Sequence, residues 1–442
     1  MPYLPFQMQD KILQNLKIQT LNPMQLASLE QARSGHDLLL LSATGSGKTL
    51  AFLLPLAEWL KETNNSVQAL ILVPSRELAL QIEQVFRQMG LKFKVNCCYG
   101  GHSLKTEKNN FLQPPALLIG TPGRIAHHLR IGSFETENLE MLVLDEFDKS
   151  LEFGFQEEMA FIISQLPALK QRILTSATAL AEIPAFTGLK RPVTLNFLGG
   201  NAPLESRLSL KYLRAADTDK LQMLLGLLCH LNQMPSLVFC NHRDAVERIS
   251  QLLLENGLPH GIFHGGMDQE ERERALIKFR NGTFRTLITT DLASRGLDIP
   301  EIGAVIHYQL PTTEEVFTHR NGRTARMKAD GTAFLLLSAE DYLPVFLKEN
   351  PELLELPDTK ELPAPSEWKT LCMGVGKKEK VNKMDVVGFL LQKGSLAKEE
   401  LGRIEVLDHA AFAAVSSGKI QKTLELIRTE KIKNIKSKFW IE

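Results

Sequence analysis

The residues with the clearest chemistry occupy positions 42–49, where Ser-Ala-Thr-Gly-Ser-Gly-Lys-Thr lies between an apolar run and a helical pattern. Glycines in such a loop let backbone N–H groups converge on phosphate oxygens, and the N-terminus of the following helix adds a favourable dipole. The lysine neutralises charge on the β- and γ-phosphates, and the next hydroxyl can bind Mg2+. A plain glycine-rich turn is the less favoured interpretation in this context. The residues expected to hold the nucleotide are Thr44, Gly45, Ser46, Gly47, Lys48 and Thr49.

A group of acids, Asp145-Glu146-Phe147-Asp148, directly follows the apolar run at 141–144. In an open parallel sheet, ligands bind at the carboxyl ends of the strands. Asp145 could therefore hold Mg2+, and Glu146 could orient or activate an attacking water. A solvated acidic turn that caps the next helix is the alternative. The loop and the acids together predict an enzyme that hydrolyses a nucleoside triphosphate.

These side chains need parallel strands to position them, and the sequence supplies two series of candidates. Runs such as 38–41 and 141–144 are apolar on successive residues, as in strands that are buried on both faces. The runs alternate with helical patterns, which predicts two α/β domains joined by a connector near 197–207. The first series covers residues 38–41, 69–73, 95–99, 116–120, 141–144 and 172–176, and the second covers 236–240, 286–289, 304–308 and 332–337.

The composition is that of an ordinary globular protein, with 442 residues, 44% apolar residues, and 51 Lys and Arg against 51 Asp and Glu. It excludes a disordered tail and a small disulfide scaffold. No apolar run approaches the ~18 residues of a membrane span. The N-terminus lacks the pattern of a signal peptide, so we expect a cytoplasmic protein. The five cysteines lack paired spacing, which favours free thiols over zinc or disulfides.

The charge is unevenly distributed along the chain. Residues 366–442 contain fifteen Lys and Arg against ten Asp and Glu, a net charge of +5. Residues 338–362 contain two against seven, a net charge of −5, and prolines mark the second half of this stretch as a linker. The overall zero is therefore a sum of unlike segments.

The basic C-terminal segment has the pattern β-α-β-β-α-β, which predicts a small α+β domain of the RNA-recognition kind. Its third strand offers one aromatic residue, Phe412, so phosphate contacts are favoured over base stacking. A solvated charged face is the alternative for its two basic clusters. The clusters are Lys377, Lys378, Lys380 and Lys383, and Lys431, Lys433, Lys436 and Lys438.

Residues 6–337 resemble the DEAD-box RNA helicases of superfamily 2, with many motifs in the family's order. The resemblance implies two tandem RecA-like domains, ATP as the nucleotide with Gln25 reading the adenine, and Mg2+ at Thr49 and Asp145. The tetrad departs from the family in having Phe147 where Ala is usual, which adds bulk beside the magnesium site. Contacts with the RNA backbone are implied for Arg76, Gly101, Thr121 and Arg124 in the first domain and for Gln269, Arg272 and Thr289 in the second.

The same resemblance implies roles in turnover. By position Arg323 and Arg326 match the family's arginine fingers, which accelerate other NTPases by about 10³–10⁵. With Lys48, Asp145 and Glu146 they form the expected catalytic set. Gly296 and Asp298 are implied to bind ATP. Coupling of hydrolysis to strand separation is implied for Ser176, Thr178, Asp148 and Arg320.

The C-terminal segment resembles the RNA-binding domain of the DbpA subgroup at residues 374–380, 402–406 and 431–433. That subgroup recognises a hairpin of large-subunit ribosomal RNA, which implies ribosome assembly as the setting. RNA contacts are expected from Lys377, Lys378 and Lys380.

We therefore expect an RNA-dependent ATPase that unwinds RNA, acting as a cytoplasmic monomer on pre-ribosomal particles. The alternatives are an RNA clamp or chaperone with weak unwinding, and a DNA translocase. The expected domains are residues 1–197, 207–345 and 366–442, with a linker at 346–365.

Overall fold

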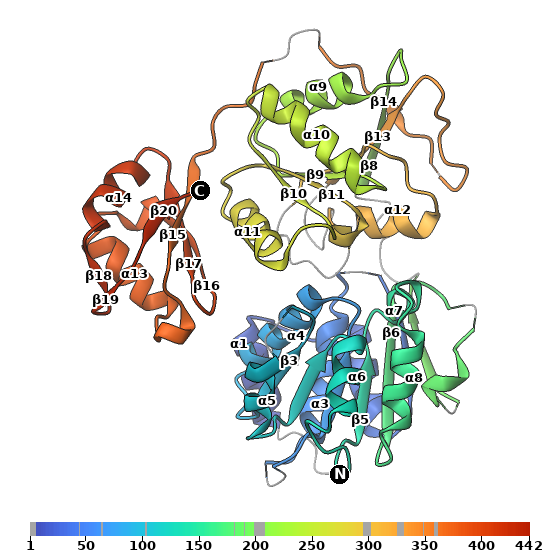
Figure 1. Cartoon of the computed structure of the whole chain (residues 1–442). Coiled ribbons are helices and arrows are strands. Elements are labelled where there is room, and N and C mark those ends of the chain that lie inside the picture. Colours follow the sequence, from blue (N-terminus) through green and yellow to red (C-terminus); the bar gives the residue numbers. More distant parts are fainter. Residues whose placement is uncertain are drawn as a thin grey trace. The chain divides into compact units, whose positions relative to one another are not determined.

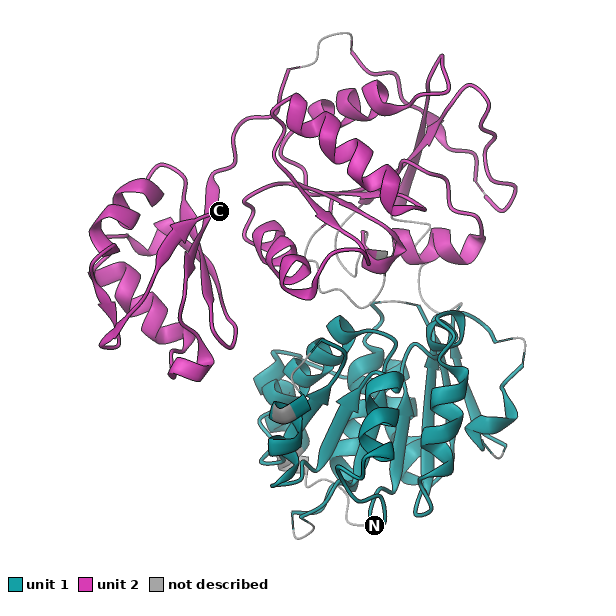
Figure 2. Cartoon of the chain, in the orientation of Figure 1, with its two compact units in different colours: residues 1–203, 296–298 teal, residues 204–295, 299–442 magenta. Residues whose placement is uncertain are grey.

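The computed structural model describes residues 6–43, 45–62, 65–101, 104–180, 182–189, 191–198, 208–294, 302–324, 331–347, 349–357 and 361–442. The chain forms two compact units, residues 1–203 with 296–298 and residues 204–295 with 299–442 (Figure 2). The predicted fold class is confirmed, with two parallel sheets followed by a small antiparallel one. Most of the predicted connector, residues 199–207, lies outside the described residues.

The first unit contains a seven-stranded parallel sheet with the order β3-β4-β2-β5-β6-β1-β7 (Figure 1). Six strands match the predicted runs closely, and β7 is additional. The strands are β1 (Leu38–Ser42), β2 (Ala69–Leu72), β3 (Val95–Cys98), β4 (Leu117–Gly120), β5 (Met141–Leu144), β6 (Gln171–Ser176) and β7 (Val193–Phe197). The helices are α1 (Phe6–Leu16), α2 (Pro23–Arg33), α3 (Lys48–Trp59), α4 (Arg76–Gln88), α5 (Leu104–Phe111), α6 (Pro122–Arg130), α7 (Phe147–Glu152), α8 (Gln156–Ser164) and the short η1 (Ala185–Thr187).

Strand β1 shows why its sequence is apolar on successive residues. Leu38 packs into one apolar cluster with residues of α3 and α4. Leu39 and Leu41 pack into a second cluster with residues of α6, α7 and α8. Because side chains of a strand alternate between faces, helices on both faces of the sheet require apolar residues at every position.

The second unit contains another seven-stranded sheet, with the order β10-β11-β9-β12-β13-β8-β14. Its pairs are all parallel. The strands are β8 (Leu208–Arg214), β9 (Ser236–Phe239), β10 (His260–Phe263), β11 (Thr286–Thr289), β12 (Ala304–His307), β13 (Gly331–Leu337) and β14 (Glu352–Leu353). The helices are α9 (Leu221–Leu231), α10 (Arg243–Glu255), α11 (Gln269–Arg280), α12 (Glu314–Asn321) and the short η3 (Asp291–Ser294).

The C-terminal segment of the second unit forms an antiparallel sheet with the order β16-β17-β15-β20. The predicted β-α-β-β-α-β pattern is confirmed, with a small hairpin added before the last strand. The elements are β15 (Trp368–Met373), η4 (Lys377–Glu379), α13 (Lys383–Gln392), η5 (Lys398–Glu400), β16 (Leu401–Val406), β17 (Ala411–Ser416), α14 (Ile420–Ile427), β18 (Lys431–Ile432), β19 (Ile435–Lys436) and β20 (Phe439–Ile441).

The antiparallel sheet packs on helix α11 within the second unit. Ile277 of α11 forms an apolar cluster with Cys372 and Phe412. Beside it, Asn281 Nδ2 donates a buried hydrogen bond to Thr370 Oγ1 at 3.1 Å. The face of the sheet that contains Phe412 is therefore covered at this position, and Phe412 is only 1% exposed.

Two further expectations from the sequence can be compared with the structure. All five cysteines are free. Within the described parts of the chain, every helix is too short or too polar to cross a membrane.

Candidate nucleotide and RNA sites

The phosphate loop connects β1 to α3. Gly45 and Gly47 have φ angles of 82° and 92°, a region that disfavours any residue with a Cβ. Gly47 is also the N-cap of α3, so the backbone after it begins the helix. Lys48 is 9% exposed, and its Nζ donates to the carbonyl oxygens of Ser42 and Ala43, the latter at 3.0 Å. The lysine ammonium thus lies over the end of β1, as expected for a group that neutralises phosphate charge.

Two side chains from the start of α2 hold this loop. Gln25 Nε2 donates to Gly47 O at 3.2 Å, and Asn22 Nδ2 donates to Ser46 O at 3.0 Å. Asn22 and Gln25 also form a capping box, which fixes both side chains at the helix N-terminus. A Cβ on Gly47 would lie 2.7 Å from Gln25 Nε2, so any other residue would displace the Gln25 side chain in addition to straining the backbone at a φ of 92°. The sequence did not single out Asn22 as a loop contact, although the spacing of Asn22 and Gln25 indicates the capping box.

The acidic residues lie at the end of β5, next to β6. Asp145 is 3% exposed, and its Oδ1 accepts a hydrogen bond from Thr175 Oγ1. Burial raises the pKa of Asp145, while the Thr175 hydroxyl and the Lys48 charge oppose that rise. The same Thr175 oxygen accepts the Glu146 N–H at 3.2 Å. Thr175 thus ties both acids to the neighbouring strand, a contact across 30 residues that sequence reasoning missed.

Glu146 has an unusual backbone conformation. Its φ of 48° lies in the left-handed region, where a residue other than glycine is strained. It is the N-cap of α7 and is 8% exposed. Such strain is typical of functional positions, and here it turns the chain sharply between β5 and α7.

Phe147 occupies a different environment from the acids around it. Its side chain is fully buried in the apolar cluster with α6 and α8, 6.2 Å from the Phe186 ring. The additional bulk expected from the sequence is therefore part of the hydrophobic core.

The donor types in the first turn of α3 and at the end of β5 suit a magnesium ion. A buried carboxylate whose pKa is raised by burial gains from a nearby cation, and Asp145 is such a group. Mg2+ takes oxygen ligands such as carboxylates and hydroxyls, which Asp145 and Thr49 provide.

The acidic tetrad is also joined to the Ser-Ala-Thr segment at the end of β6. Thr178 Oγ1 donates to Asp148 Oδ2 at 3.0 Å. Ser176 Oγ donates to Thr178 O at 2.6 Å and accepts the Thr178 N–H at 3.1 Å. The structure therefore brings together three residues expected to couple hydrolysis to strand separation.

The first unit also places the RNA-backbone candidates near one another. The Arg76 guanidinium lies 4.4 Å from the centroid of the Tyr99 ring. Gly101 has a φ of 83°, and a Cβ there would lie 3.9 Å from Arg76 Nη1. Thr121 is the N-cap of α6, and Arg124 in the first turn donates from Nε to Glu107 Oε2 at 2.6 Å.

In the second unit, Arg320 is the centre of a buried network. It is 0% exposed, and its Nε and Nη2 donate to both Asp291 carboxylate oxygens at 2.6 and 3.1 Å. Nη2 also donates to Asn241 Oδ1 at 2.8 Å, and Nη1 donates to Gln309 O at 2.9 Å. Because a guanidinium is a planar fork, one side chain fixes the ends of several strands.

The other candidates of this unit lie on different elements. Arg323 is 2% exposed just after α12, and Thr289 Oγ1 donates to Phe263 O at 2.7 Å. Gln269 and Arg272 lie in the first turn of α11. Four predicted site residues lie outside the described residues: Thr44, Gly296, Asp298 and Arg326.

The basic residues of the C-terminal segment are only partly available. Lys377, Lys378 and Lys380 are exposed around η4. In the second cluster, Lys433 Nζ instead donates to Asp385 Oδ2 at 3.0 Å and to Lys380 O at 2.8 Å, so it joins the hairpin to the start of α13. Since Phe412 is covered by α11, exposed lysines are the better-supported contacts for RNA.

Comparisons with known proteins identify relatives over nearly the whole chain. Residues 22–185 match the DEAD/DEAH box helicase family, residues 219–328 the helicase conserved C-terminal domain, and residues 370–440 the DbpA RNA binding domain. The chain is 31% identical to the ATP-dependent RNA helicase DbpA of Escherichia coli, covering 95% of this chain and 94% of that protein. It is 29% identical to the ATP-dependent RNA helicase DbpA of Bacillus subtilis, covering 93% and 92%.

Solved structures of similar fold include S. cerevisiae Dbp5 bound to RNA and ADP BeF3. That structure has a TM-score of 0.67 and 26% identity, covering 76% of this chain and 88% of that one. Mss116p bound to ssRNA and AMP-PNP also has a TM-score of 0.67, with 25% identity and coverage of 76% and 73%.

Proposed function

Since the chain belongs to the DEAD-box family and is an ATP-dependent RNA helicase of the DbpA type, we propose that its substrate is large-subunit ribosomal RNA. The observation that carries this proposal is the match of residues 370–440 to the DbpA RNA binding domain. The protein would remodel RNA in pre-ribosomal particles, acting as a cytoplasmic monomer. Residues 1–197 and 207–345 would form the motor, and residues 366–442 would select the RNA. The segment between them, residues 346–365, was expected to be a linker but contains β14, which pairs with β8 of the second sheet.

ATP binding would use two side chains that contact the backbone of the phosphate loop, Lys48 and Gln25. Lys48 would exchange the carbonyls of Ser42 and Ala43 for phosphate oxygens. Gln25 would meet the adenine edge while its capping box keeps it beside Gly47. The remaining ATP contacts would come from the phosphate loop, at Thr44, Gly45, Ser46 and Gly47, and from Gly296 and Asp298.

Thr49 and Asp145 would hold Mg2+, which neutralises phosphate charge when it is bound. Glu146 would orient the attacking water, and its strained φ of 48° fixes the direction of its side chain. Arg323 and Arg326 would stabilise the charge of the transition state, an effect of about 10³–10⁵ in rate in other NTPases.

Coupling to RNA would depend on the contacts around the catalytic acids. The bond from Thr178 to Asp148 connects the acidic tetrad to the segment after β6, and Arg320 holds the second unit's loops together. The RNA backbone would be contacted by Arg76, Gly101, Thr121, Arg124, Gln269, Arg272 and Thr289.

An RNA-selection experiment tests the ribosomal target. In Lys377→Ala/Lys378→Ala, we expect RNA-stimulated ATPase to persist with unstructured RNA, while the preference for large-subunit ribosomal RNA falls. Lys398→Ala/Lys422→Ala is the matched control, because these lysines are also exposed on the same domain. An unchanged preference in the first variant would contradict selection by this basic cluster.

The second candidate function, an RNA clamp with weak unwinding, differs in its need for turnover. We expect Glu146→Gln to retain ATP binding and to lose multiple-turnover unwinding. We expect Arg326→Ala to lose RNA-stimulated turnover with ATP binding largely intact. Unwinding that persists in Glu146→Gln would favour the clamp, and a stronger ATPase response to DNA than to RNA of equal length would favour a DNA translocase.

A further inference from the structure

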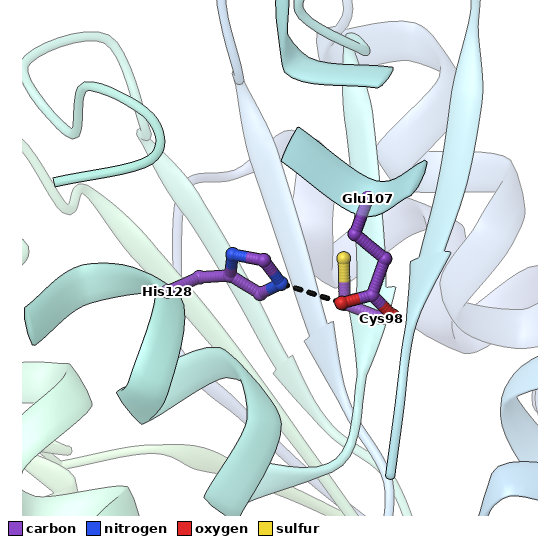
Figure 3. Close-up of side chains that lie close together, drawn as sticks. All are labelled: Cys98, Glu107 and His128. Atoms are coloured by element: carbon purple, nitrogen blue, oxygen red, sulfur yellow. Dashed lines mark hydrogen bonds and ion pairs between the residues drawn. The ribbon is translucent and has the colours of Figure 1, made fainter. Parts of the chain in front are cut away.

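A buried cluster in the first unit has no part in the contacts to ATP described above. Glu107 of α5 is 1% exposed and lies beside Cys98 and His128 (Figure 3). His128 Nε2 is 2.6 Å from Glu107 Oε2, and Arg124 Nε donates to the same oxygen at 2.6 Å. The other carboxylate oxygen, Oε1, accepts the backbone N–H of Tyr99 at 3.4 Å.

The three side chains have donor types that could bind a metal ion, since their ligand atoms lie within 4.8 Å of one another. Two observations oppose that assignment. The Arg124 guanidinium already donates to Glu107, so a metal ion would meet a fixed positive charge. Burial raises the pKa of the Cys98 thiol, whereas metal binding requires a thiolate. The cluster is therefore better explained as a hydrogen-bonded ion-pair network.

The network is centred on a charged carboxylate. Burial alone would raise the pKa of Glu107, but hydrogen bonds from His128 and Arg124 outweigh it and hold the pKa below its usual value. The other ring nitrogen of His128, Nδ1, is 2.9 Å from Ser133 Oγ, which fixes the ring from the far side. Each partner of Glu107 thus has a defined orientation.

The elements that Glu107 joins are those expected to contact the RNA backbone. Arg124 lies in the first turn of α6, and Tyr99 precedes the Gly100-Gly101 turn. The Tyr99 ring in turn supports the Arg76 guanidinium at 4.4 Å. We propose that Glu107, held by His128, is a positioning residue that aligns Arg124 and the 99–101 turn for RNA. This inference rests on the proposed RNA contact of Arg124.

The Glu107→Gln variant of the full-length protein tests this inference, with Glu157→Gln as the matched control on the exposed surface of α8. We expect the RNA concentration that gives half-maximal ATPase activity to rise about tenfold, because this is the effect expected from the loss of one charge-assisted hydrogen bond. The KM for ATP and the kcat at saturating RNA should change less than about twofold. A plot of the logarithm of RNA affinity against the logarithm of salt concentration should become less steep by about 0.7, which is the contribution of one phosphate contact on a single strand.

Arg124→Ala and the double variant Glu107→Gln/Arg124→Ala complete a double-mutant cycle for RNA affinity. If Glu107 acts through Arg124, the double variant binds RNA about as weakly as Arg124→Ala alone. Additive losses, or normal RNA affinity in Glu107→Gln, would overturn the inference. If Arg124→Ala itself leaves RNA affinity and its salt dependence unchanged, the proposed RNA contact fails instead.

A second variant covers the case in which Glu107→Gln is too unstable to assay. His128→Gln keeps the ion pair between Glu107 and Arg124 but removes the ring that orients the carboxylate. We expect a loss of RNA affinity of about threefold, smaller than in Glu107→Gln because the ion pair between Glu107 and Arg124 remains. RNA affinity equal to that of the unmodified protein would overturn the inference.

Discussion

Replacing Phe147 with alanine separates the structural part of the acidic tetrad from its catalytic part. The Phe147 side chain is 0% exposed and packs near Phe186 in the apolar cluster between the first sheet and helices α6 and α8. Removing a fully buried phenyl ring from a packed core costs about 3–5 kcal/mol, because a cavity remains where the ring was. For a unit of about 200 residues, this corresponds to a fall in melting temperature of roughly 10 °C.

Calorimetric unfolding of Phe147→Ala measures this loss. Leu112→Ala is the control, because Leu112 is 82% exposed and its truncation should change the free energy of unfolding by less than about 0.5 kcal/mol. At a temperature where the variant remains folded, we expect RNA-stimulated kcat and the KM for ATP to stay within about threefold, since the ring is part of the core. A loss of stability below about 1 kcal/mol would refute the assigned packing. A large loss of kcat in fully folded Phe147→Ala would refute the separation of structure from catalysis.

Three further variants test the acids and their supports. Burial raises the pKa of Asp145 in the folded state above its value of about 3.9 in the unfolded chain. Without a bound metal ion, the protein therefore loses stability as the pH rises from the unfolded pKa through the folded pKa. Asp145→Asn should therefore unfold at higher urea than the unmodified protein at pH 7 in EDTA, with the difference vanishing near pH 3, and lower stability at pH 7 would contradict this. Thr175→Val removes both hydroxyl contacts, so we expect a loss of about 1–3 kcal/mol in unfolding free energy and a lower kcat at unchanged RNA affinity; an unchanged kcat would show that the hydroxyl has no catalytic influence. Arg320→Lys keeps the positive charge but cannot reproduce the fork to Asp291 and Asn241, so we expect about 1–3 kcal/mol lower stability in denaturant titrations, and full stability would contradict the buried network.

The strands of the two parallel sheets that the sequence missed are β7, β8, β10 and β14, which lie at or beside a sheet edge, although the edge strand β3 was predicted. Central strands such as β1 and β5 are covered on both faces and are therefore apolar on successive residues. The edge strand β7 alternates half-buried and exposed residues, with Thr194 and Asn196 on the exposed side. Strand β10 contains Gly261, where a Cβ would lie 2.3 Å from the Phe284 ring. Neither strand has the continuous apolar run on which the prediction depended.

The same distinction separates the site residues that the sequence located from those it missed. Motif residues such as Lys48 and Asp145 have neighbours that reveal their type of chemistry. Their supports lie far away in the chain: Thr175 contacts Asp145 across 30 residues, and Glu107 contacts Arg124 across 17. A lone threonine or glutamate has no local pattern that indicates such a contact. Only the pairing of strands and helices in the fold brings these residues together.

The packing of the C-terminal segment also changes the meaning of its charge. Its formal balance is fifteen basic against ten acidic residues. Two of the acids are paired with helix α11: Glu405 with Arg280 at 3.3 Å, and Glu442 with Arg274 and Lys278, both at 3.3 Å. Basic residues of α11 thus neutralise two of the acidic residues of the segment, while Lys377 and Lys378 remain exposed. The surface offered to RNA is consequently more basic than the net charge of +5 indicates, which favours the phosphate contacts proposed for this domain.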